Sequence, residues 1–421
     1  MAQAIDGMRV APLKRFARVG NGGTPTADEI NWGGNIPFVT PPDLNGLDGK
    51  AITTVGRSLT EVGARSSGVA QPGDVIVSTR APIGHIGTAV ADCAFNQGCR
   101  SVRAGPALSS AFLAYVLVSA RPEMESRGLG TTFVELSGSG LASLPVMVPP
   151  LGIQLRTVEY LDKETAEIDA FIADQEQLIG LLAERHASKT ARVLSIGMDE
   201  SASVRASGLD HIGVVPEHWS IVPTRRLCTI TTGVEDSGNA NPAGEYPFFV
   251  RGREILRSDS YLFDTEAVMT PGDGQGGTGK VFHYYFGKFQ AHQRVYVFKD
   301  FSGIAARYFY YYISAFLQPV ALSRSNTVTM ESLRRPMLAD FMVALPPLDE
   351  QNRAVDYLDA QTASIDALIA DADRSVALAS ERRAALITAA VTGQIDVTSG
   401  RPRIVRPTCE AGSVPTSEGE L

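Results

Sequence analysis

The sequence has few cysteines and no long apolar segment. Its four cysteines are scattered, and none forms a CxxC pair or a Cys/His cluster with zinc-type spacing, so neither disulfides nor a structural metal are expected. The longest apolar run, from Ala111 to Ala120, falls far short of the ~20 residues that a membrane span needs. The first residues contain no apolar core of signal-peptide length. We therefore expect a protein of the cytoplasm.

A recognisable active site is also lacking. The Asn/Asp-Pro-Pro-aromatic motif of adenine methyltransferases has its nearest equivalent in TPPD, from Thr40, which lacks both ends. No nucleophile elbow is present. His85, His283 and His292 lie near predicted strand–loop junctions, where a lone histidine is more often a hydrogen-bonded structural residue than a catalyst. Nothing in the sequence therefore looks like an active site.

One glycine-rich stretch, TPGDGQGGTGKVFHYY from Thr270, partly matches a phosphate-binding loop. Gly274, Gly279 and Lys280 have the right spacing, but Val281 replaces the hydroxyl residue that would bind magnesium. The residues that follow are aromatic and β-branched, which is typical of a strand and not of the helix that such a loop requires. We therefore predict a turn between strands, with Gln275, Thr278 and Lys280 as polar tips close to a ligand.

Length and charge suggest several domains with an uneven charge distribution. The 421 residues exceed one ordinary core, and 44% hydrophobic with 20% charged residues is typical of a folded, soluble protein. The formal net charge is −8, but residues 148–200 and 346–396 each carry −5, whereas residues 1–147 and 201–345 each carry +1. The two long segments could therefore still bind a polyanion.

The chain contains an internal repeat. The segment from Val148 to Asp199 returns from Leu345 to Asp396, with 22 of 52 positions identical and no gap. Each copy has a Pro-Pro pair at its second and third positions, Pro149-Pro150 and Pro346-Pro347, which fits the entry to a helix but not its interior. Two unrelated core helices are the alternative, which this identity disfavours.

Each copy is predicted to be one long helix. Apolar residues recur at alternating spacings of three and four, which is the pattern of a coiled-coil seam. At ~1.5 Å per residue each helix would be on the order of 60 Å long, and the simplest partner for each apolar stripe is the other copy. The seam residues that we expect to hold helix to helix are Val158, Leu161, Ile168, Val355, Leu358 and Ile365.

The segments before the two helices resemble each other faintly. IPFVTPPDL from Ile36 aligns with YPFFVRGRE from Tyr246, AFNQGCRSV from Ala94 with QAHQRVYVF from Gln290, and RAPIGHIG from Arg80 with GGTGKVF from Gly276. Alternating apolar residues between Gly and Pro positions predict β-rich modules. A further helix is expected in each module, around 109–120 and 304–317.

The helix motifs point to a family. PPLGIQ at Pro149 and PPLDEQ at Pro346, the YLD…T..ID..I pattern after each, and VPEHWSIVPTRRL at Val215 resemble the DNA-specificity subunit of type I restriction-modification systems. This resemblance extends to about Asp396. It implies an α+β protein with two β-rich target recognition domains separated by two long antiparallel coiled-coil helices, related by a pseudo-twofold internal duplication.

The expected boundaries follow from the repeat and the resemblance together. They are a first target recognition domain at 1–147, a first spacer helix at 148–195, a linker at 196–213, a second target recognition domain at 214–345, a second spacer helix at 346–396 and a flexible tail at 397–421.

The resemblance also implies partners. Each module would read one half of a split site in double-stranded DNA, and the helices would dock two methyltransferase subunits through exposed positions beside the seam. Restriction/translocase subunits would join for cleavage. No cofactor is expected on this chain, because S-adenosylmethionine would bind the methyltransferases, and ATP with Mg²⁺ the translocase.

For base reading we select polar residues in corresponding loops, because arginine can bond guanine and Asn or Gln can bond adenine in the major groove. Each could instead serve loop structure or a salt bridge. The expected DNA-binding residues are Thr40, Arg80, Asn96, Gln97, Arg251, Arg253, Gln275, Lys280, His292 and Arg294. Two other functions stay open: a helical scaffold that links partner proteins without DNA, and a nucleotide-dependent enzyme built on the glycine-rich stretch.

Overall fold

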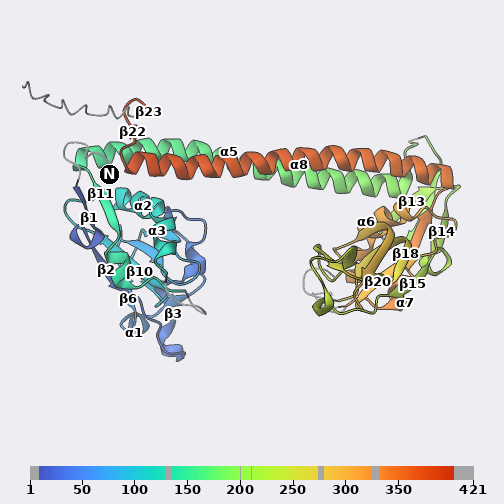
Figure 1. The fold of residues 1–421 in the computed structure, drawn as a ribbon, viewed down its shortest axis with the longest axis horizontal. Helices are drawn as coiled ribbons and strands as arrows, with labels where there is room; N and C mark the ends of the chain where they lie inside the picture. Colours follow the sequence, from blue (N-terminus) through green and yellow to red (C-terminus); the bar gives the residue numbers. More distant parts are fainter. Residues whose placement is uncertain are drawn as a thin grey trace, which may run out of the picture. The chain divides into compact units, whose positions relative to one another are not determined.

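The computed structural model describes residues 9–128, 134–199, 201–209, 211–273, 279–323 and 332–402. The chain divides into two compact units (Figure 1). Unit 1 comprises Met1–Asp174 and Ser375–Leu421, and unit 2 comprises Gln175–Arg374. Each unit therefore contains one β-rich module, named module 1 or module 2, together with part of each long helix.

The two predicted long helices are present as α5, Leu151–Ile196, and α8, Leu348–Val391. Each begins directly after a Pro-Pro pair, as predicted. Helix α8 ends earlier than the predicted residue 396, because Gly393 adopts a left-handed backbone with φ of 70°. The amides of Gly393 and Gln394 bond back to Ala390 and Ala389 at 3.2 and 2.8 Å, which is a glycine-terminated helix end.

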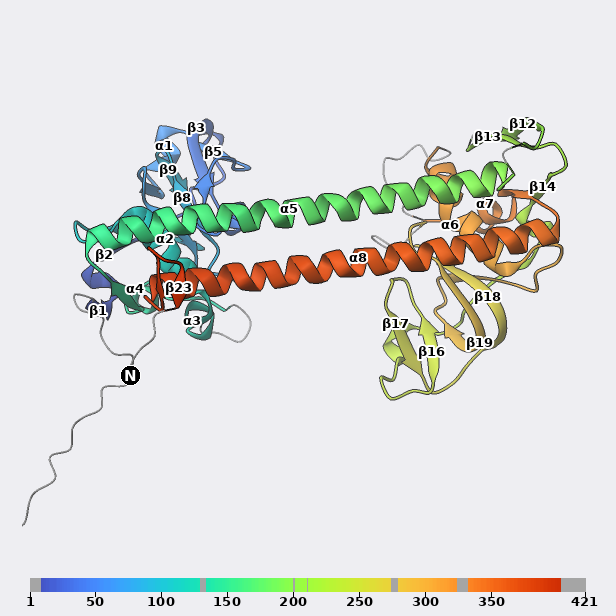
Figure 2. The same ribbon diagram turned by 90° about the horizontal axis from the view of Figure 1, so that it is seen from above.

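Within each unit α5 and α8 pack antiparallel (Figure 2). In unit 1, Arg383 Nε of α8 lies 2.8 Å from Asp169 Oδ1 of α5. In unit 2, His186 and Lys189 of α5 bond Thr362 and Gln361 of α8, at 3.0 and 3.4 Å. Higher residue numbers in α5 therefore face lower residue numbers in α8, so the two helices run in opposite directions.

The six predicted seam residues are all buried or half-buried, but their role is wider than predicted. Leu161 and Val158 pack with Ile387 of α8 and also with the core of module 1. Leu358 and Val355 pack with Leu194 of α5 and also with the core of module 2. Ile168 and Ile365 are buried as well. The seam therefore joins each helix both to the other helix and to a module.

Module 1 is built on two short sheets. The first has the strand order β2-β10-β7-β8-β4 and the second β5-β3-β9-β6. The strands are β2 Ala17–Asn21, β3 Trp32–Val39, β4 Ala51–Ile52, β5 Ser58–Leu59, β6 Gly68–Ala70, β7 Val75–Ser78, β8 Ile86–Ala89, β9 Cys93–Phe95 and β10 Cys99–Ala104. The helices are α1 Glu61–Ala64, α2 Ser110–Ser119, α3 Arg121–Ser126 and α4 Gly138–Ala142.

Module 2 repeats this topology in one sheet, ordered β15-β20-β18-β19-β16-β17. Its strand β19 takes the place of both β8 and β9, since it pairs antiparallel with β18 and then parallel with β16. The elements are β15 Thr229–Thr232, β16 Tyr246–Phe249, β17 Ile255–Ser258, β18 Phe263–Pro271, β19 His283–Ala291, β20 Val295–Lys299, α6 Ala306–Ser323 and α7 Arg335–Ala339. Helices α2 and α6 confirm the two further predicted helices.

A two-stranded ribbon leads from each module into its long helix. In unit 1, β1 Arg9–Pro12 pairs antiparallel with β11 Pro145–Val148. In unit 2, β14 Ser220–Pro223 pairs in the same way with β21 Met342–Leu345. The two modules thus share one design from their first strand to the start of the helix.

Two segments differ from the predicted boundaries. The predicted linker, 196–213, contains most of a hairpin formed by β12 Val204–Leu209 and β13 Ile212–Pro216, whose Ile212 and Val215 are buried in the module 2 core. The predicted tail begins with a folded ribbon, in which β22 Ile395–Asp396 pairs with β23 Arg401–Pro402. Ile395 and Val397 pack on the module 1 core, and this tertiary contact supplies the apolar burial that the segment cannot provide alone.

Across the described ranges, no helix is both long enough and apolar enough to cross a membrane.

Candidate nucleic-acid interface

The same strand edge carries the predicted reading residues in both modules. In module 1, β3 and β9 run parallel, with Phe38 opposite Ala94. In module 2, β16 and β19 run parallel, with Phe248 opposite Gln290. These registers match the sequence alignment between the modules. Because parallel strands end on the same side, the loops after each pair meet at one edge.

The backbone at this edge is duplicated in detail. The amide of Asn96 bonds the carbonyl of Val39 at 3.0 Å, and the amide of His292 bonds that of Phe249 at 2.9 Å. Likewise, the amides of Thr79 and Gly272 bond the carbonyls of Gly98 and Arg294, both at 2.8 Å. Asn96, Gln97 and Gly98 therefore correspond to His292, Gln293 and Arg294. The backbone is shared while the side chains differ.

In module 1 the structure brings Thr40, Arg80, Asn96 and Gln97 to this edge. A β-carbon at Gly98 would lie within 4 Å of Pro41, Asn96 and Arg80. The Thr40 hydroxyl donates to Asp43 Oδ2 at 2.5 Å, and Asn96 Oδ1 accepts from the Gly98 amide at 3.0 Å. Gln97 is exposed and accepts from the Thr24 hydroxyl. Thr40 thus serves to cap the following 3-10 turn, while the Asn96 amide nitrogen and Gln97 stay available to a ligand.

A carboxylate in module 1 lies between two arginines. Glu135 pairs with Arg80 at 3.0 Å and with Arg100 at 3.7 Å, and the backbones of Arg80 and Glu135 form an antiparallel bridge. Arg100 also donates to the carbonyl of Gln97 at 3.1 Å, while its Nε is buried without a hydrogen-bond partner among the described residues. The carboxylate therefore orients two guanidinium groups at the same edge.

Module 2 has a similar arrangement at the backbone bridge that corresponds to Arg80–Glu135. There the carboxylate belongs to the first residue of the bridge and not to the second. Asp273, which bridges Ser332, pairs with Arg294 at 2.8 Å and lies 3.8 Å from Arg251. The side chains of Arg294 and Arg251 are 56% and 46% exposed, so each guanidinium still presents an open edge. Such a half-open arginine can exchange a carboxylate for a base or a phosphate.

His292 has a structural role that its sequence position did not indicate. Its ring is 2% exposed, and Nδ1 accepts from the Arg294 amide at 3.0 Å. Burial, together with the positive charge of Arg251, lowers the pKa of His292, so the ring is neutral near pH 7. Placing His292 among base-reading residues is therefore not supported by this conformation, because the ring holds the loop that presents Arg294.

The remaining predicted residues surround the loop after β16. Arg253 and Lys280 are exposed. His283 Nε2 contacts the Gly252 carbonyl at 3.2 Å, which joins this loop to the start of β19, the strand after Lys280. Gln275 lies outside the described residues. The chain after Lys280 continues into β19, as predicted for a turn between strands and contrary to a phosphate-binding loop.

Four residues of this edge were missed from the sequence: Arg100, Glu135, Asp273 and Gln293. Gln293 could have been found, because it aligns with Gln97 in the repeat. The other three could not, since Glu135 and Asp273 meet their arginines through tertiary contacts over long chain separations. Among the described residues, no group of three His, Cys, Asp or Glu side chains is placed to hold a metal ion.

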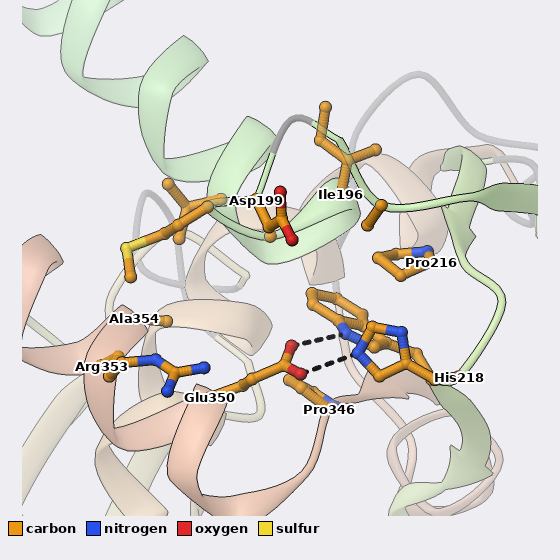
Figure 3. A pocket seen from close by; sticks show the side chains of 13 residues that line it. Ile196, Asp199, Pro216, His218, Pro346, Glu350, Arg353 and Ala354 are labelled. Carbon is orange, nitrogen blue, oxygen red and sulfur yellow. Dashed lines mark hydrogen bonds and ion pairs between the residues drawn. The ribbon is translucent and has the colours of Figure 1, made fainter.

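A cavity of about 280 Å³ in unit 2 lies where two of the family motifs meet (Figure 3). Glu350 of the PPLDEQ motif accepts from Trp219 Nε1 at 3.0 Å and contacts His218 Nε2 at 2.7 Å. Glu350 lies in the first turn of α8, where the helix dipole favours a carboxylate. These contacts join the VPEHW segment to the start of α8.

Two tyrosines join the modules to the long helices, and their titration should lower the stability of the fold at alkaline pH. Burial raises the pKa of Tyr115 and of Tyr311 to about 12, and each phenol donates to a helix carboxylate. A raised pKa means that the protonated phenol stabilises the fold fully below pH 10.0, its ordinary pKa, and that this contribution is lost as pH rises through about 12. We expect the melting temperature to fall between these pH values while tyrosinate absorbance rises. Titration of every tyrosine near pH 10 in the folded chain would contradict this.

Together, the duplicated modules and paired helices define a protein with two similar β-rich modules, each packed against a pair of long antiparallel helices. Residues 5–179 and 216–372 match the family model described as type I restriction modification DNA specificity domain. The chain belongs to this family.

The comparisons with individual proteins agree with this. The chain is 28% identical over 183 residues to the type I restriction enzyme EcoDI specificity subunit of Escherichia coli, covering 44% of this chain and 40% of that one. It is 30% identical over 145 residues to the MjaIX specificity subunit of Methanocaldococcus jannaschii, covering 33% of this chain and 34% of that one. These matches span less than half the length of the curated relatives. A solved chain of the type I R-M system shares the fold, with a TM-score of 0.65 and 19% identity over 94% of this chain and all of that one.

Proposed function

We propose that this chain is the non-catalytic subunit that reads a two-part site in double-stranded DNA and brings methyltransferase subunits to it. The observation that carries the proposal is the duplicated strand edge, at which arginine and amide side chains gather on the same backbone in both modules. Two modules with the same backbone and different side chains at this edge are suited to reading different half-sites. Clustered arginines also account for DNA binding by modules of nearly zero net charge.

The partners follow from the family and not from contacts on this chain. Two methyltransferase subunits would dock on the long helices and would carry S-adenosylmethionine. Restriction/translocase subunits would supply ATP-driven cleavage, and all of them would act in the cytoplasm. A scaffold that never binds DNA is the competing function, but it gives no reason for paired arginines at the same edge of both modules.

Arg294→Ala tests this proposal. Methylome sequencing of the host with and without the gene would first identify the two-part motif. With the chain and its methyltransferases bound to that duplex, we expect the variant to lose about 5- to 150-fold in affinity, because an arginine that bonds a base contributes ~1–3 kcal/mol. Affinity for duplexes with the module 2 half-site scrambled should not change.

The matched control is Arg225→Ala, an arginine of the same module with equal side-chain exposure of 56% that pairs with Asp340 away from the strand edge. It should leave sequence-specific affinity unchanged. Equal losses for both variants would contradict the interface. Absence of any gene-dependent two-part motif would favour the scaffold.

A further inference from the structure

The family motif glutamines are buried anchors between module and helix. Gln154 of α5 is fully buried; its Oε1 accepts from the Ser109 amide at 2.8 Å, and its Nε2 donates to the carbonyls of Ala107 and Pro149 at 2.9 and 2.7 Å. Gln351 of α8 is also fully buried and makes the same three bonds. Its partners are the Ala305 amide and the Gly303 and Pro346 carbonyls, at 2.8, 3.2 and 2.9 Å.

A second attachment lies about two helical turns further along each long helix. Tyr115 of α2 donates to Asp162 at 2.7 Å and lies 3.5 Å from the Thr165 hydroxyl. In unit 2, Tyr311 of α6 bonds Asp359 at 2.5 Å and lies 3.4 Å from the Thr362 hydroxyl. These residues are the Asp and Thr of the repeated YLD…T pattern. Arg307 adds two further bonds to Asp359, at 2.8 and 3.0 Å.

Together these contacts form what we call clamp 1 and clamp 2. Clamp 1 consists of Gln154, Asp162 and Thr165 with their partners in module 1, and clamp 2 of Gln351, Asp359 and Thr362 with theirs in module 2. Each clamp holds the module helix alongside the long helix at two points roughly 12 Å apart, since eight helical residues rise ~1.5 Å each. One attachment point would leave the module free to swing about it, whereas a second point restricts this motion to the line between the two, and the apolar contacts with the long helix restrict it further.

We infer that the clamps are positioning devices that set how strictly the protein selects the distance between its two half-sites, an inference that rests on the proposed function. Adding one base pair between the half-sites moves one of them by ~3.4 Å and turns it by about 35° around the duplex. A module held at two points cannot follow both changes. A module that has lost its second attachment is held by its glutamine and by the apolar contacts around Leu161 or Leu358, so it can follow these changes in part and a wrong spacing is penalised less.

The test measures the affinity for duplexes that carry the two half-sites identified from the methylome. The half-sites lie at the native spacing, one base pair further apart or one base pair closer. The chain is used in complex with its methyltransferases. The clamp variant is Tyr115→Phe with Tyr311→Phe, which keeps both rings and removes the hydroxyl bonds to Asp162 and Asp359, while the two Arg307 bonds to Asp359 remain in clamp 2. The matched control is Tyr308→Phe, because the Tyr308 hydroxyl donates to the Ala344 carbonyl within module 2, at 3.2 Å, and not to Asp359 of the clamp.

The wild-type complex should prefer the native spacing by at least about tenfold. The clamp variant should reduce this preference by ~5- to 10-fold, which is less than the full contribution of hydrogen bonds to charged groups because the apolar contacts and the Arg307 bonds remain. Tyr308→Phe should retain it. Hydrogen exchange at the Ser109 and Ala305 amides should also become about tenfold faster in the clamp variant. Should that variant fail to fold, Asp162→Asn weakens the same bond without removing the partner.

Unchanged spacing preference in the clamp variant, or preference lost equally in the control, would overturn the clamps as positioning devices while leaving the proposed function intact. So would a wild-type complex that binds both half-sites but accepts every spacing. A wild-type complex that prefers neither half-site over unrelated DNA would remove the proposed function itself, and this inference with it.

Discussion

Gln154→Leu is expected to lower the free energy of unfolding of unit 1 by about 3 kcal/mol. Leucine matches glutamine approximately in size but leaves the half-buried Ser109 amide and the buried Pro149 carbonyl without their glutamine partner, and each such group costs ~1–3 kcal/mol. Gln351→Leu should act likewise on unit 2, through Ala305 and Pro346. Hydrogen exchange of peptides from each unit measures the two effects separately, so no two-state transition of the whole chain has to be assumed.

The control for this effect is Gln177→Leu, an exposed glutamine on the same helix α5. Surface substitutions of this kind usually change stability by less than about 0.5 kcal/mol. If peptides of unit 1 exchanged hydrogen equally slowly in Gln154→Leu and in Gln177→Leu, the buried glutamine would not anchor the module. An equal acceleration of exchange in unit 2 by Gln154→Leu would likewise contradict the assignment of this contact to unit 1.

Leu358→Ala should have a comparable effect in unit 2, with a loss of about 2–5 kcal/mol, the usual range for a fully buried leucine. Leu358 is 1% exposed and belongs to a cluster that includes Leu194 of α5 and Tyr308 of module 2. The truncation therefore loosens the helix–helix contact and the helix–module contact at once. Hydrogen exchange should accelerate in α6 as well as in α5 and α8.

The matched control is Leu368→Ala on the same helix, where the side chain is 50% exposed. It removes the same atoms from a largely solvated position and should cost well under 1 kcal/mol. Acceleration confined to the two long helices after Leu358→Ala would mean that this residue serves only the helix seam, as the sequence pattern alone had predicted.

Under the proposed function, the arginine pairs would let two modules with one backbone read different DNA. Gly98 of module 1 corresponds to Arg294 of module 2, and the carboxylate that orients the arginines lies at Glu135 in one module and at Asp273 in the other. The hydrogen-bonded backbone keeps the same edge in place while the side chains on it are exchanged. Substitutions at these positions alter the groups offered to a ligand without disturbing the strand pairing behind them.

The repeat, the two long helices, the strand-rich modules and the family could all be recognised from residue order. Their signals are local: a 3-4 apolar spacing, Pro-Pro before each helix, and identities at a constant offset. The corresponding loops could be aligned as well, because the strands before them share a pattern. The boundaries at 196–213 and after residue 396 could not be predicted in this way. Both ribbons are stabilised by contacts with a core whose residues lie far away in the sequence.

Tertiary structure alone decided which side chains at the strand edge do which task. His292 and Thr40 are polar loop residues by pattern, yet one is buried and the other caps a turn, while Arg100 and Glu135, which no motif marks, complete the edge. It also decided that the motif Gln, Asp and Thr residues bind the modules. A side chain's role depends on the partners within about 3 Å of it, and those partners come from segments dozens of residues away, at distances that residue order does not specify.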